Sequence, residues 1–424
     1  SPNHYSKKID SRESKLYITK TIIPVIHTLR DKELIGFQKG FNDHPTLGNR
    51  ISRIWALPIL EDYFKEIQSL AFFDFYKERE VIVLRDEDKN NIAYKRNSHV
   101  DDMKTVVDNY NSLIRETFID IPYLEKPTLK YKNSEGHERH IYINQQTKFT
   151  KRVFNKSSFE LGGRFYGGWW QSISEEYRKD IYLNDLRTNE IDFTALHPIL
   201  AYAEKGINYW ETSPVGSNSI TDPYDIPTIG IKDKKIARKF NKLLFLTSLN
   251  ADTETLAFSS FNDQWRKKGY TLPDSYDDLL KHHSLKEQLE RIKEYHFPIR
   301  DMFCTGVGRK LMYIDSQITE HIIRDHIERR IPILTIHDSY IVPFGKEDGL
   351  LKAMKNATER ITGFETKVDY NKYGTSMYLN HLKGYSKSTG VERDYFIDNL
   401  KTFYQSNPEA TRTKGYLERF AKHK

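Results

Sequence analysis

At 424 residues, the chain is long enough for two or three domains or for one large, multi-lobed domain. Only 38% of its residues are hydrophobic, but 27 tyrosines and 23 phenylalanines can fill a packed core, which argues against a wholly disordered protein. The 66 Lys and Arg residues exceed the 59 Asp and Glu residues, and this mild positive excess fits a nucleic-acid partner without requiring one.

Cysteine usage and apolar patterning bound the setting of the protein. Cys304 is the single cysteine, which excludes internal disulfides and cysteine-rich zinc sites and favours a reducing, cytoplasmic environment. The sequence contains no apolar run of about 18 residues and no signal peptide, so we expect neither membrane insertion nor secretion. The absence of an initiator Met indicates a processed or trimmed chain.

The first third of the chain indicates no particular chemistry. Residues 1–20 are polar and predict an arm or a first strand. Residues 21–125 are predicted to be mainly helical, because apolar residues recur at helical spacing in 59–75 and 103–118. Residues 131–142 carry Asn-Ser-Glu-Gly between alternating segments, which predicts a β-hairpin. We expect this region to support or grip a ligand.

A glycine- and aromatic-rich stretch follows at 159–170, with the sequence Phe-Glu-Leu-Gly-Gly-Arg-Phe-Tyr-Gly-Gly-Trp-Trp. Its glycines let the backbone approach a bulky ligand, and Arg164 can clamp a phosphate. Its aromatic rings offer surfaces for base stacking. The alternative is a hairpin whose aromatic side chains pack in the core, and both interpretations stay open at this point.

A short strand is predicted to end at Asp192, and a helix is predicted over 195–203, with Pro198 tolerated in its first turn. A carboxylate at a strand end suits Mg²⁺ or Mn²⁺, because these ions prefer oxygen ligands. Considered alone, Asp192 can equally serve as a helix N-cap.

The next segments are a loop and an amphipathic helix. Residues 210–230 are rich in Ser, Pro, Gly and Asp and predict a loop, whereas 234–249 predict a helix with an apolar face. Its opposite face carries Lys235, Arg238 and Lys242 at i, i+3 and i+7. Such a row of cations is typical of a solvated helix face, and it can also grip a triphosphate.

Further helices are predicted over 253–300, including 279–295, and over 311–329. Residues 331–342 then predict a β-hairpin with His337, Asp338 and Ser339 at its turn. The alternative for this turn is an ordinary one that happens to contain Asp. If the fold brings Asp192 and Asp338 together, their carboxylates can bridge two metal ions about 4 Å apart for an in-line phosphoryl displacement.

Taken together, these segments resemble the single-subunit, right-handed nucleic-acid polymerases, namely family A DNA polymerases and phage-type or mitochondrial-type RNA polymerases. Asp192 is similar to the metal-binding Asp of the first palm motif. His337-Asp338 resembles the last palm motif, which carries the second metal-binding Asp. Arg238 and Lys242 keep the Arg-x-x-x-Lys spacing of the fingers helix that grips the incoming triphosphate.

Two further elements resemble motifs of the RNA polymerases. Glu160-x-x-Gly163-Arg164 is similar to the Asp-x-x-Gly-Arg element that touches the template and the hybrid. Ser316-Gln317 has a counterpart one helix before the last motif. The resemblance covers roughly 160–345 and is carried by short motifs in the family's order.

The resemblance implies an α+β fold: a right-hand polymerase with an antiparallel-sheet palm, helical fingers and a mainly helical N-terminal region. It implies a thumb-like N-terminal region over 1–155 and a palm over 156–384, with fingers inserted at about 211–300. A basic C-terminal tail, predicted to be helical over 393–404, would occupy 385–424 and contact nucleic acid or nothing.

The same resemblance assigns roles to single residues. Asp192 and Asp338 would bind two Mg²⁺ or Mn²⁺ ions, with Arg238 and Lys242 completing the catalytic set. Besides Arg238 and Lys242, the expected nucleotide-binding residues are His197, Asn250 and Phe193, and the expected template-binding residues are Gly163, Arg164, Gln317 and His337. The implied partners are a template, a primer or nascent strand and nucleoside triphosphates. We expect a monomer in the cytoplasm of a bacterial, phage-infected or mobile-element host.

Several positions depart from the family patterns. Asn250-Ala251 stands where both families usually have Tyr-Gly, whose Tyr stacks on the nascent base pair. Asp315 stands where the RNA polymerases place a ribose-sensing His. Ser339 follows the final His-Asp, as in the RNA polymerases, where family A DNA polymerases often have Glu.

The sugar of the nucleotide substrate is the main open question. His197 lies five residues after Asp192, where family A DNA polymerases place Glu and RNA polymerases a small residue, and it resembles the bulky ribose gate of family B DNA polymerases. Its ring can exclude a 2′-hydroxyl, bind one, or pack under the fingers. We favour a DNA polymerase, with a single-subunit RNA polymerase or primase-like enzyme as the alternative. A catalytically inactive, nucleic-acid-binding replication accessory protein is the alternative of another class.

Overall fold

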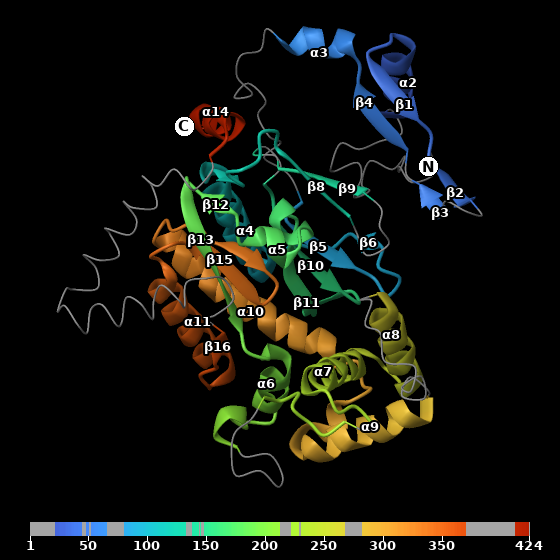
Figure 1. Ribbon diagram of the computed structural model, residues 1–424, viewed down its shortest axis with the longest axis vertical. Coiled ribbons are helices and arrows are strands. Elements are labelled where there is room, and N and C mark those ends of the chain that lie inside the picture. Colours follow the sequence, from blue (N-terminus) through green and yellow to red (C-terminus); the bar gives the residue numbers. More distant parts are fainter. Residues whose placement is uncertain are drawn as a thin grey trace, which may run out of the picture. The chain divides into compact units, whose positions relative to one another are not determined.

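The computed structural model describes residues 22–44, 48–50, 52–65, 80–132, 138–143, 145, 148–212, 222–228, 230–267, 282–369 and 412–423. They form a mixed α+β structure, in agreement with the predicted class (Figure 1). The chain divides into two compact units, 1–80 with 92–95 and 81–91 with 96–424. The predicted arm over 1–20 and the predicted helix over 393–404 lie outside the described residues.

The smaller unit contains more strand than the sequence suggested. Helices α2 (Ile22–Asp31) and α3 (Pro58–Lys65) accompany two antiparallel pairs, β1 (Ile35–Gln38) with β4 (Arg53–Ala56) and β2 (Phe41–His44) with β3 (Gly48–Arg50). The prediction that 21–125 is mainly helical is therefore wrong here. Gly36 lies opposite Trp55 in the first pair, and a Cβ on this glycine would lie 2.1 Å from the indole ring. Such a cross-strand pair stabilises a sheet, and helical spacing does not reveal it.

The central sheet of the larger unit has the order β14-β15-β13-β12-β7, and β16 pairs with the last two residues of β13. Its strands are β7 (Ile119–Asp120), β12 (Tyr182–Leu183), β13 (Leu186–Phe193), β14 (Leu334–Ile336), β15 (Ser339–Pro343) and β16 (Val368–Asp369). Strands β14 and β15 form the predicted hairpin over 331–342. β15 pairs antiparallel with β13, from Thr188 opposite Pro343 to Asp192 opposite Ser339.

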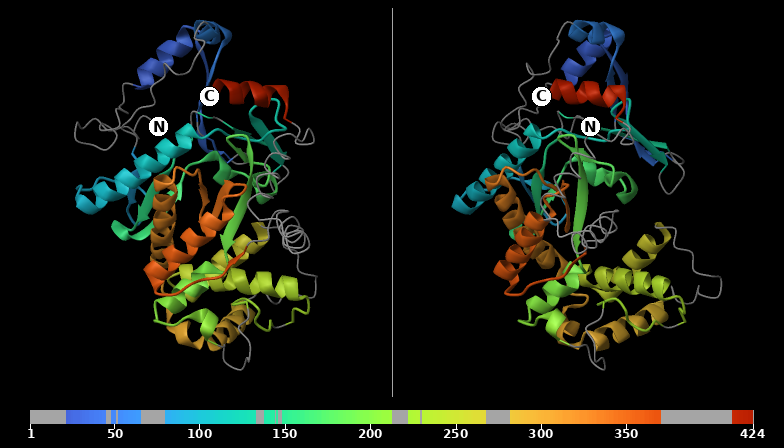
Figure 2. Two further views of the ribbon diagram at one scale, coloured as in Figure 1. Left: turned by 90° about the vertical axis from the view of Figure 1, so that its left-hand side faces the viewer. Right: turned by 60° about the vertical axis from the view of Figure 1, so that its left-hand side comes forward.

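One face of the central sheet is buried against helix α10 (Gly308–Glu328). Tyr340, which lies opposite Ile191, shares a hydrogen bond of 2.9 Å with Thr319 of this helix. Because side chains alternate along a strand, Glu190, Asp192 and Ser339 lie on the other face. Figure 2 shows α10 beside α11 (Glu347–Thr362), and these two helices cover the face that carries Tyr340.

A second sheet has the order β11-β10-β5-β6 and lies against α10. Its strands are β5 (Ile82–Arg85), β6 (Asn91–Ile92), β10 (Lys151–Asn155) and β11 (Ser158–Tyr166), and a separate hairpin of β8 (Thr128–Lys132) and β9 (Glu138–Tyr142) confirms the hairpin predicted over 131–142. Arg152 of β10 is fully buried and holds sheet and helix together. Its guanidinium donates to the Gly163 carbonyl at 2.8 Å and to the Ser316 hydroxyl at 3.0 Å, and it forms an ion pair with Glu320.

The helices of the larger unit follow the predicted amphipathic segments closely. Helix α4 begins after Asn97, whose side chain accepts a hydrogen bond from the Val100 amide at 2.8 Å. Helices α7, α8 and α9 gather at one end of the unit, and α10 runs from them along the strands (Figure 1). The remaining bounds are α4 (Ser98–Glu116), α5 (Glu175–Arg178), α6 (Leu196–Ala203), α7 (Lys234–Asn250), α8 (Glu254–Lys267), α9 (His282–Tyr295) and the 3-10 turns η4 (Trp169–Ser172), η5 (Tyr209–Glu211) and η7 (Phe297–Met302). None of the described helices is long and apolar enough to span a membrane.

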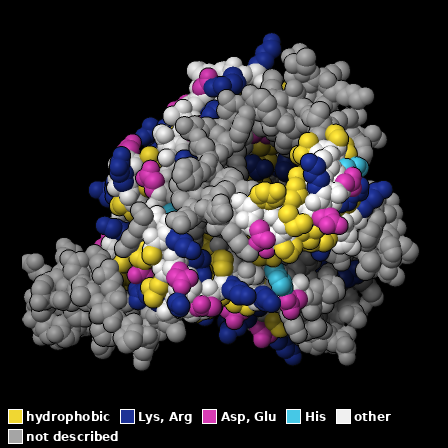
Figure 3. Space-filling model, turned by 90° about the horizontal axis from the view of Figure 1, so that it is seen from above, with side chains coloured by type: hydrophobic (Ala, Val, Ile, Leu, Met, Phe, Trp, Pro, Cys, Tyr) yellow, Lys and Arg dark blue, Asp and Glu magenta, His cyan; other side chains and the backbone are white. Residues whose placement is uncertain are grey.

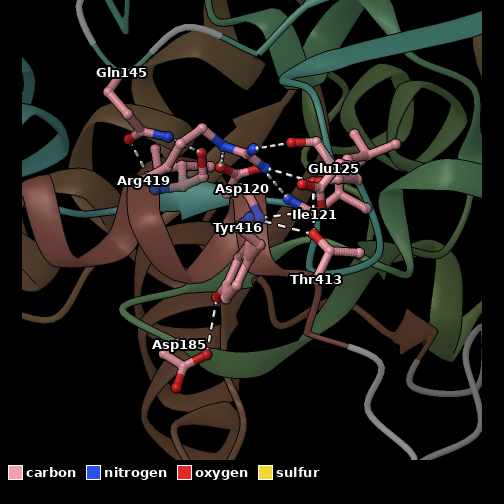
Figure 4. A network of polar contacts seen from close by, with 11 residues as sticks. Asp120, Ile121, Glu125, Gln145, Asp185, Thr413, Tyr416 and Arg419 are labelled. Carbon is pink, nitrogen blue, oxygen red and sulfur yellow. Dashed lines mark hydrogen bonds and ion pairs between the residues drawn. The ribbon is translucent and has the colours of Figure 1, made fainter.

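The last helix, α14 (Lys414–His423), packs against β7 and the residues around it. Tyr416 is buried with its ring 5.4 Å from that of Phe118, and its hydroxyl donates to Asp185 at 2.9 Å. Arg419 donates to the buried carboxylate of Asp120 at 2.7 Å (Figure 4). The end of the predicted basic tail is thus bound within the larger unit by specific contacts.

Candidate active site

Asp192 lies near the end of β13, and Asp338 lies in the turn between β14 and β15, directly before the strand that pairs with β13. The backbone amide of Phe193 donates to the carbonyl oxygen of Asp338 at 3.3 Å, and Asp192 is in register with Ser339. His337, in the turn, has a φ of 55°, in the left-handed region that non-glycine residues rarely adopt. The fold therefore brings the two predicted metal ligands together, although their role in metal binding stays a prediction.

A polar network fixes this hairpin from the side that carries Asp192. The Ser339 hydroxyl donates to Glu190 at 2.7 Å, and Arg178 of α5 donates to both oxygens of the same carboxylate at 3.0 Å each. Two parallel bonds between a guanidinium and a carboxylate fix orientation as well as position. Glu190 is not among the site residues predicted from the sequence, although its place two residues before Asp192 predicts the same face of the strand.

The chain turns sharply between Asp192 and His197. Ala195 has a φ of 53°, and this conformation costs a non-glycine residue about 1–2 kcal/mol. Helix α6 begins at the next residue, so His197 lies in its first turn. Strained backbone of this kind often occurs at functional sites. Phe193, which we expected to contact the nucleotide, is only 3% exposed and lies edge-on to Tyr340, which favours a packing role for it.

Arg164 forms a buried ion pair rather than an exposed phosphate contact. Its Nε donates to Asp315 of α10 at 2.5 Å, and the two side chains are 13% and 0% exposed. Burial opposes the charge of the guanidinium, but the carboxylates of Asp315 and Asp338 raise the pKa of Arg164. This arrangement favours the packing interpretation of Arg164. Direct contact of Arg164 with the template stays a prediction.

His197 and Asp315 both adjoin Arg164, and both have a shifted pKa. Burial lowers the pKa of His197 to about 4, and Arg164 adds to this effect, so the imidazole is neutral at pH 7. Burial raises the pKa of Asp315 to about 6, and Asp338 adds to this effect while Arg164 opposes it. These electrostatic effects place both residues in the same neighbourhood as Asp338.

The glycine- and aromatic-rich stretch packs internally. Gly163 has a φ of 78°, and a Cβ there would lie 2.6 Å from the Phe154 ring and 2.8 Å from the Ser316 hydroxyl. Trp169 and Trp170 are buried, so their rings do not offer the exposed stacking surfaces that the sequence suggested. The glycine therefore permits strand β11 to approach α10, whereas the sequence had suggested approach to a nucleic acid.

Helix α7 carries the two cations that resemble those of the fingers. Its N-cap Asp233 accepts from two backbone amides, and its apolar face is buried. Arg238 and Lys242 are exposed on the other side, 5.6 Å and 5.7 Å from the centroid of the Tyr224 ring. Arg238 also forms an ion pair of 2.6 Å with Asp222. A triphosphate that binds at this face would have to displace Asp222 from Arg238. Exposed ion pairs contribute little free energy, so this displacement is possible.

A cavity of about 530 Å³ lies beside these elements. Its wall includes Arg164 and His197, Leu246 and Asn250 of α7, and further residues from α8 and the start of α10. This volume lies within the range of small-ligand sites. Asp192 and Asp338 are not part of the wall, but the Asp338 carboxylate acts electrostatically on Arg164 and His197, which are. Asn250 also lies against Gly308, where a Cβ would lie 2.2 Å from its Oδ1 atom.

The other predicted template-binding residues, His337 and Gln317, do not line the cavity. His337 is exposed, with its ring 5.7 Å from that of Tyr166, and Gln317 is partly exposed on α10. Lys and Arg side chains are interspersed with Asp and Glu on the face that Figure 3 shows. On that face, the described residues gather no single patch of one charge that would indicate nucleic-acid binding by itself.

The donors available for a metal ion are two carboxylates. Within the described ranges, no group of three or more His, Cys, Asp and Glu side chains is placed to hold a metal ion. Mg²⁺ commonly binds through one or two carboxylates together with water and substrate phosphates. Asp192 at the end of β13 and Asp338 in the adjoining turn fit that donor set, because substrate would supply the remaining oxygens.

Comparisons with known proteins give limited similarity. No protein-family model matches the chain. No curated protein matches it either. Among solved structures, the chain is similar to the POL domain of Pol1 from M. smegmatis, described in complex with a DNA primer-template and dNTP. The match has 10% sequence identity and a TM-score of 0.33, and it covers 52% of this chain and 46% of that one. The chain thus spans about half of that structure, and a likeness this distant carries no argument about activity.

Proposed function

We propose that the protein is a template-directed nucleotidyltransferase that joins nucleoside triphosphates to a 3′-hydroxyl, with deoxynucleotides as the favoured substrates. The observation that supports this most strongly is that Asp192, near the end of β13, is paired with Ser339, the residue that follows Asp338 in the adjoining turn. His197 lines a cavity of nucleotide size, and both the Asp338 carboxylate and the exposed Lys242 of α7 act electrostatically on its imidazole. Positioning and charge stabilisation supply most of the catalysis in phosphoryl transfer, and these residues provide both.

Each part of the site would have a separate task. When bound, two Mg²⁺ ions would activate the 3′-hydroxyl and stabilise the leaving pyrophosphate. Asp192 and Asp338 would hold these ions, and Glu190 with Ser339 would keep the hairpin in place. Arg238 and Lys242 would bind the triphosphate, and Lys242 would protonate or neutralise the leaving group. In this proposal the palm occupies 156–384, with fingers at about 211–300 between its strands and a thumb-like region over 1–155.

The preference for deoxynucleotides rests on His197. Arg164 donates toward Nε2 of His197 at 3.3 Å, so this nitrogen already has a partner. A ring held in this way at the cavity wall can exclude a 2′-hydroxyl by contact. Ribonucleotide synthesis is the second candidate, because Nδ1 still carries a proton that can bind a 2′-hydroxyl. A non-catalytic accessory protein is the third, because Asn250 stands where the polymerases usually have a stacking Tyr.

Nucleotide incorporation on primed and unprimed templates, with Mg²⁺ or Mn²⁺ and with dNTPs or NTPs, tests the proposal. We expect primer extension with dNTPs. Extension with NTPs alone would favour the second candidate. Template binding without any extension under all of these conditions would contradict the proposal and favour an accessory role.

A further inference from the structure

Three residues from three elements form a continuous chain of contacts beside the cavity. Asp315 of α10 accepts from Nε of Arg164 at 2.5 Å. Nη2 of the same guanidinium lies 3.3 Å from Nε2 of His197 on α6. Arg164 thus contacts a carboxylate and an imidazole at the same time, and we name this set the Asp315–Arg164–His197 chain.

The direction of the hydrogen bonds determines the state of the imidazole. A guanidinium has only donors, so Nε2 of His197 must accept from Arg164. The imidazole is neutral, because its pKa is lowered to about 4, and its proton is therefore on Nδ1. The chain thus fixes both the orientation and the tautomer of the ring. Rotation of the imidazole would break a bond to a charged donor, which is stronger than a bond between neutral groups.

Asp315 differs from the other two members in its access to the cavity. Arg164 and His197 are both part of the cavity wall, whereas Asp315 is fully buried and is not. Asp315 therefore does not contact a molecule in the cavity, whereas its ion-pair partner Arg164 can. Its Oδ1 atom has no hydrogen-bond partner among the described residues. The ion pair with Arg164 is thus the main interaction that holds this carboxylate in the core.

We propose that Asp315 is a positioning residue that, through Arg164, holds the His197 ring against the cavity and thereby sets the discrimination against nucleotides with a 2′-hydroxyl. This inference rests on the proposed nucleotide site. A wall excludes an extra hydroxyl only if it does not yield, because a mobile ring moves aside and the contact is lost. Removal of Asp315 leaves Arg164 free to reorient, and the ring then loses its fixed position.

The test compares nucleotide discrimination in Asp315→Asn, Arg164→Met and the double variant. Discrimination is measured with the full chain as the ratio of dATP to ATP binding with Ca²⁺, and as the ratio of their kcat/KM values with Mg²⁺. We expect each single variant to lower the ratio about tenfold, and the double variant to lower it no further, because all three break one chain. In a His197→Ala background, none of these changes should alter the ratio. An unchanged ratio in Asp315→Asn, or a persistent effect without His197, would overturn the proposal.

Asp120→Asn is the matched control. Asp120 is also 0% exposed and pairs with an arginine that is 17% exposed, but it lies on β7 with α14. This variant should lower thermal stability as Asp315→Asn does, while the dATP-to-ATP ratio stays at the wild-type value. An equal fall of the ratio in both variants would show a general structural effect and would overturn the positioning role.

A spectroscopic arm separates this inference from the proposed function. Nitrogen-15 NMR of the histidines should show His197 as a neutral ring with its proton on Nδ1, identified by its loss in His197→Gln. Arg164→Met should replace this signal with a tautomer mixture, and Asp315→Asn should shift it in the same direction. Absent incorporation with a changed binding ratio would contradict only the polymerase activity. A tautomer that is unchanged in Arg164→Met would overturn the inference whatever the activity.

Discussion

The replacement Gly163→Ala distinguishes packing from template contact at the most informative glycine of the chain. A methyl group there would lie 2.6 Å from the Phe154 ring and 2.8 Å from the Ser316 hydroxyl, in a backbone conformation with a φ of 78°. The left-handed conformation costs about 1–2 kcal/mol. Overpacking adds about 1–3 kcal/mol. We therefore expect a loss of about 2–5 kcal/mol, or a fall in Tm of about 4–10 °C in a large domain.

The matched control is Gly206→Ala. Gly206 follows α6 with a φ of 70°, and a methyl group there would meet no atom of another segment within 4 Å, so only the conformational cost of about 1–2 kcal/mol applies. Differential scanning fluorimetry and urea unfolding would measure both variants, and fluorescence anisotropy would measure their affinity for a primed template. The packing account predicts the larger loss of stability for Gly163→Ala. Wild-type stability together with strongly reduced template affinity would refute it.

Three further predictions address other parts of the larger unit. Lys242→Ala should reduce turnover about hundredfold while template affinity changes little, because charge develops at the triphosphate; an equal loss of both would place α7 on the template backbone. Burial lowers the pKa of His296 to about 4, so the unfolded chain binds more protons between pH 6.5 and 4 and stability falls as pH falls through that window. Over this pH interval, the free energy of unfolding of His296→Gln, measured in urea, should fall by about 3 kcal/mol less than that of the wild-type protein. An identical pH profile in the two proteins would contradict the assignment. Arg419→Met should leave the Asp120 carboxylate buried without its ion pair and lower the free energy of unfolding by about 3 kcal/mol. The loss should be measurable as a lower Tm and as faster proteolysis of α14. Protection of α14 at the wild-type level would be inconsistent with these contacts.

Amphipathic segments with clear boundaries were predictable from the sequence. The helix predicted over 234–249 and the hairpin over 331–342 are confirmed as α7 and as β14 with β15. Their signals are local, because an N-cap, a 3.6-residue period and a turn flanked by apolar runs each act within a few residues. The same reasoning failed for the smaller unit, where short strands pair across other segments and leave no helical or alternating pattern of useful length.

The candidate site was predictable only in part. The sequence singled out Asp192 and Asp338, and the antiparallel register of β13 and β15 brings them together. It did not reveal that Arg164 would pair with Asp315, because 151 residues separate them and no local pattern links them. It also assigned Gly163 to ligand approach, because a glycine that permits close packing looks the same in sequence as one that admits a ligand. Long-range contacts of this kind require the three-dimensional structure.

The most direct test of the central claim is metal-dependent nucleotide incorporation by Asp338→Asn beside the wild-type protein. Asparagine keeps the size of the side chain but removes the charge that would hold Mg²⁺, so the hairpin and the template affinity should be retained. The account predicts primer extension by the wild-type protein that requires Mg²⁺ or Mn²⁺, and a loss of at least about 10³-fold in the variant, as expected when a metal ligand is removed from the reacting centre. Turnover near the wild-type value in Asp338→Asn would contradict the proposed two-metal site.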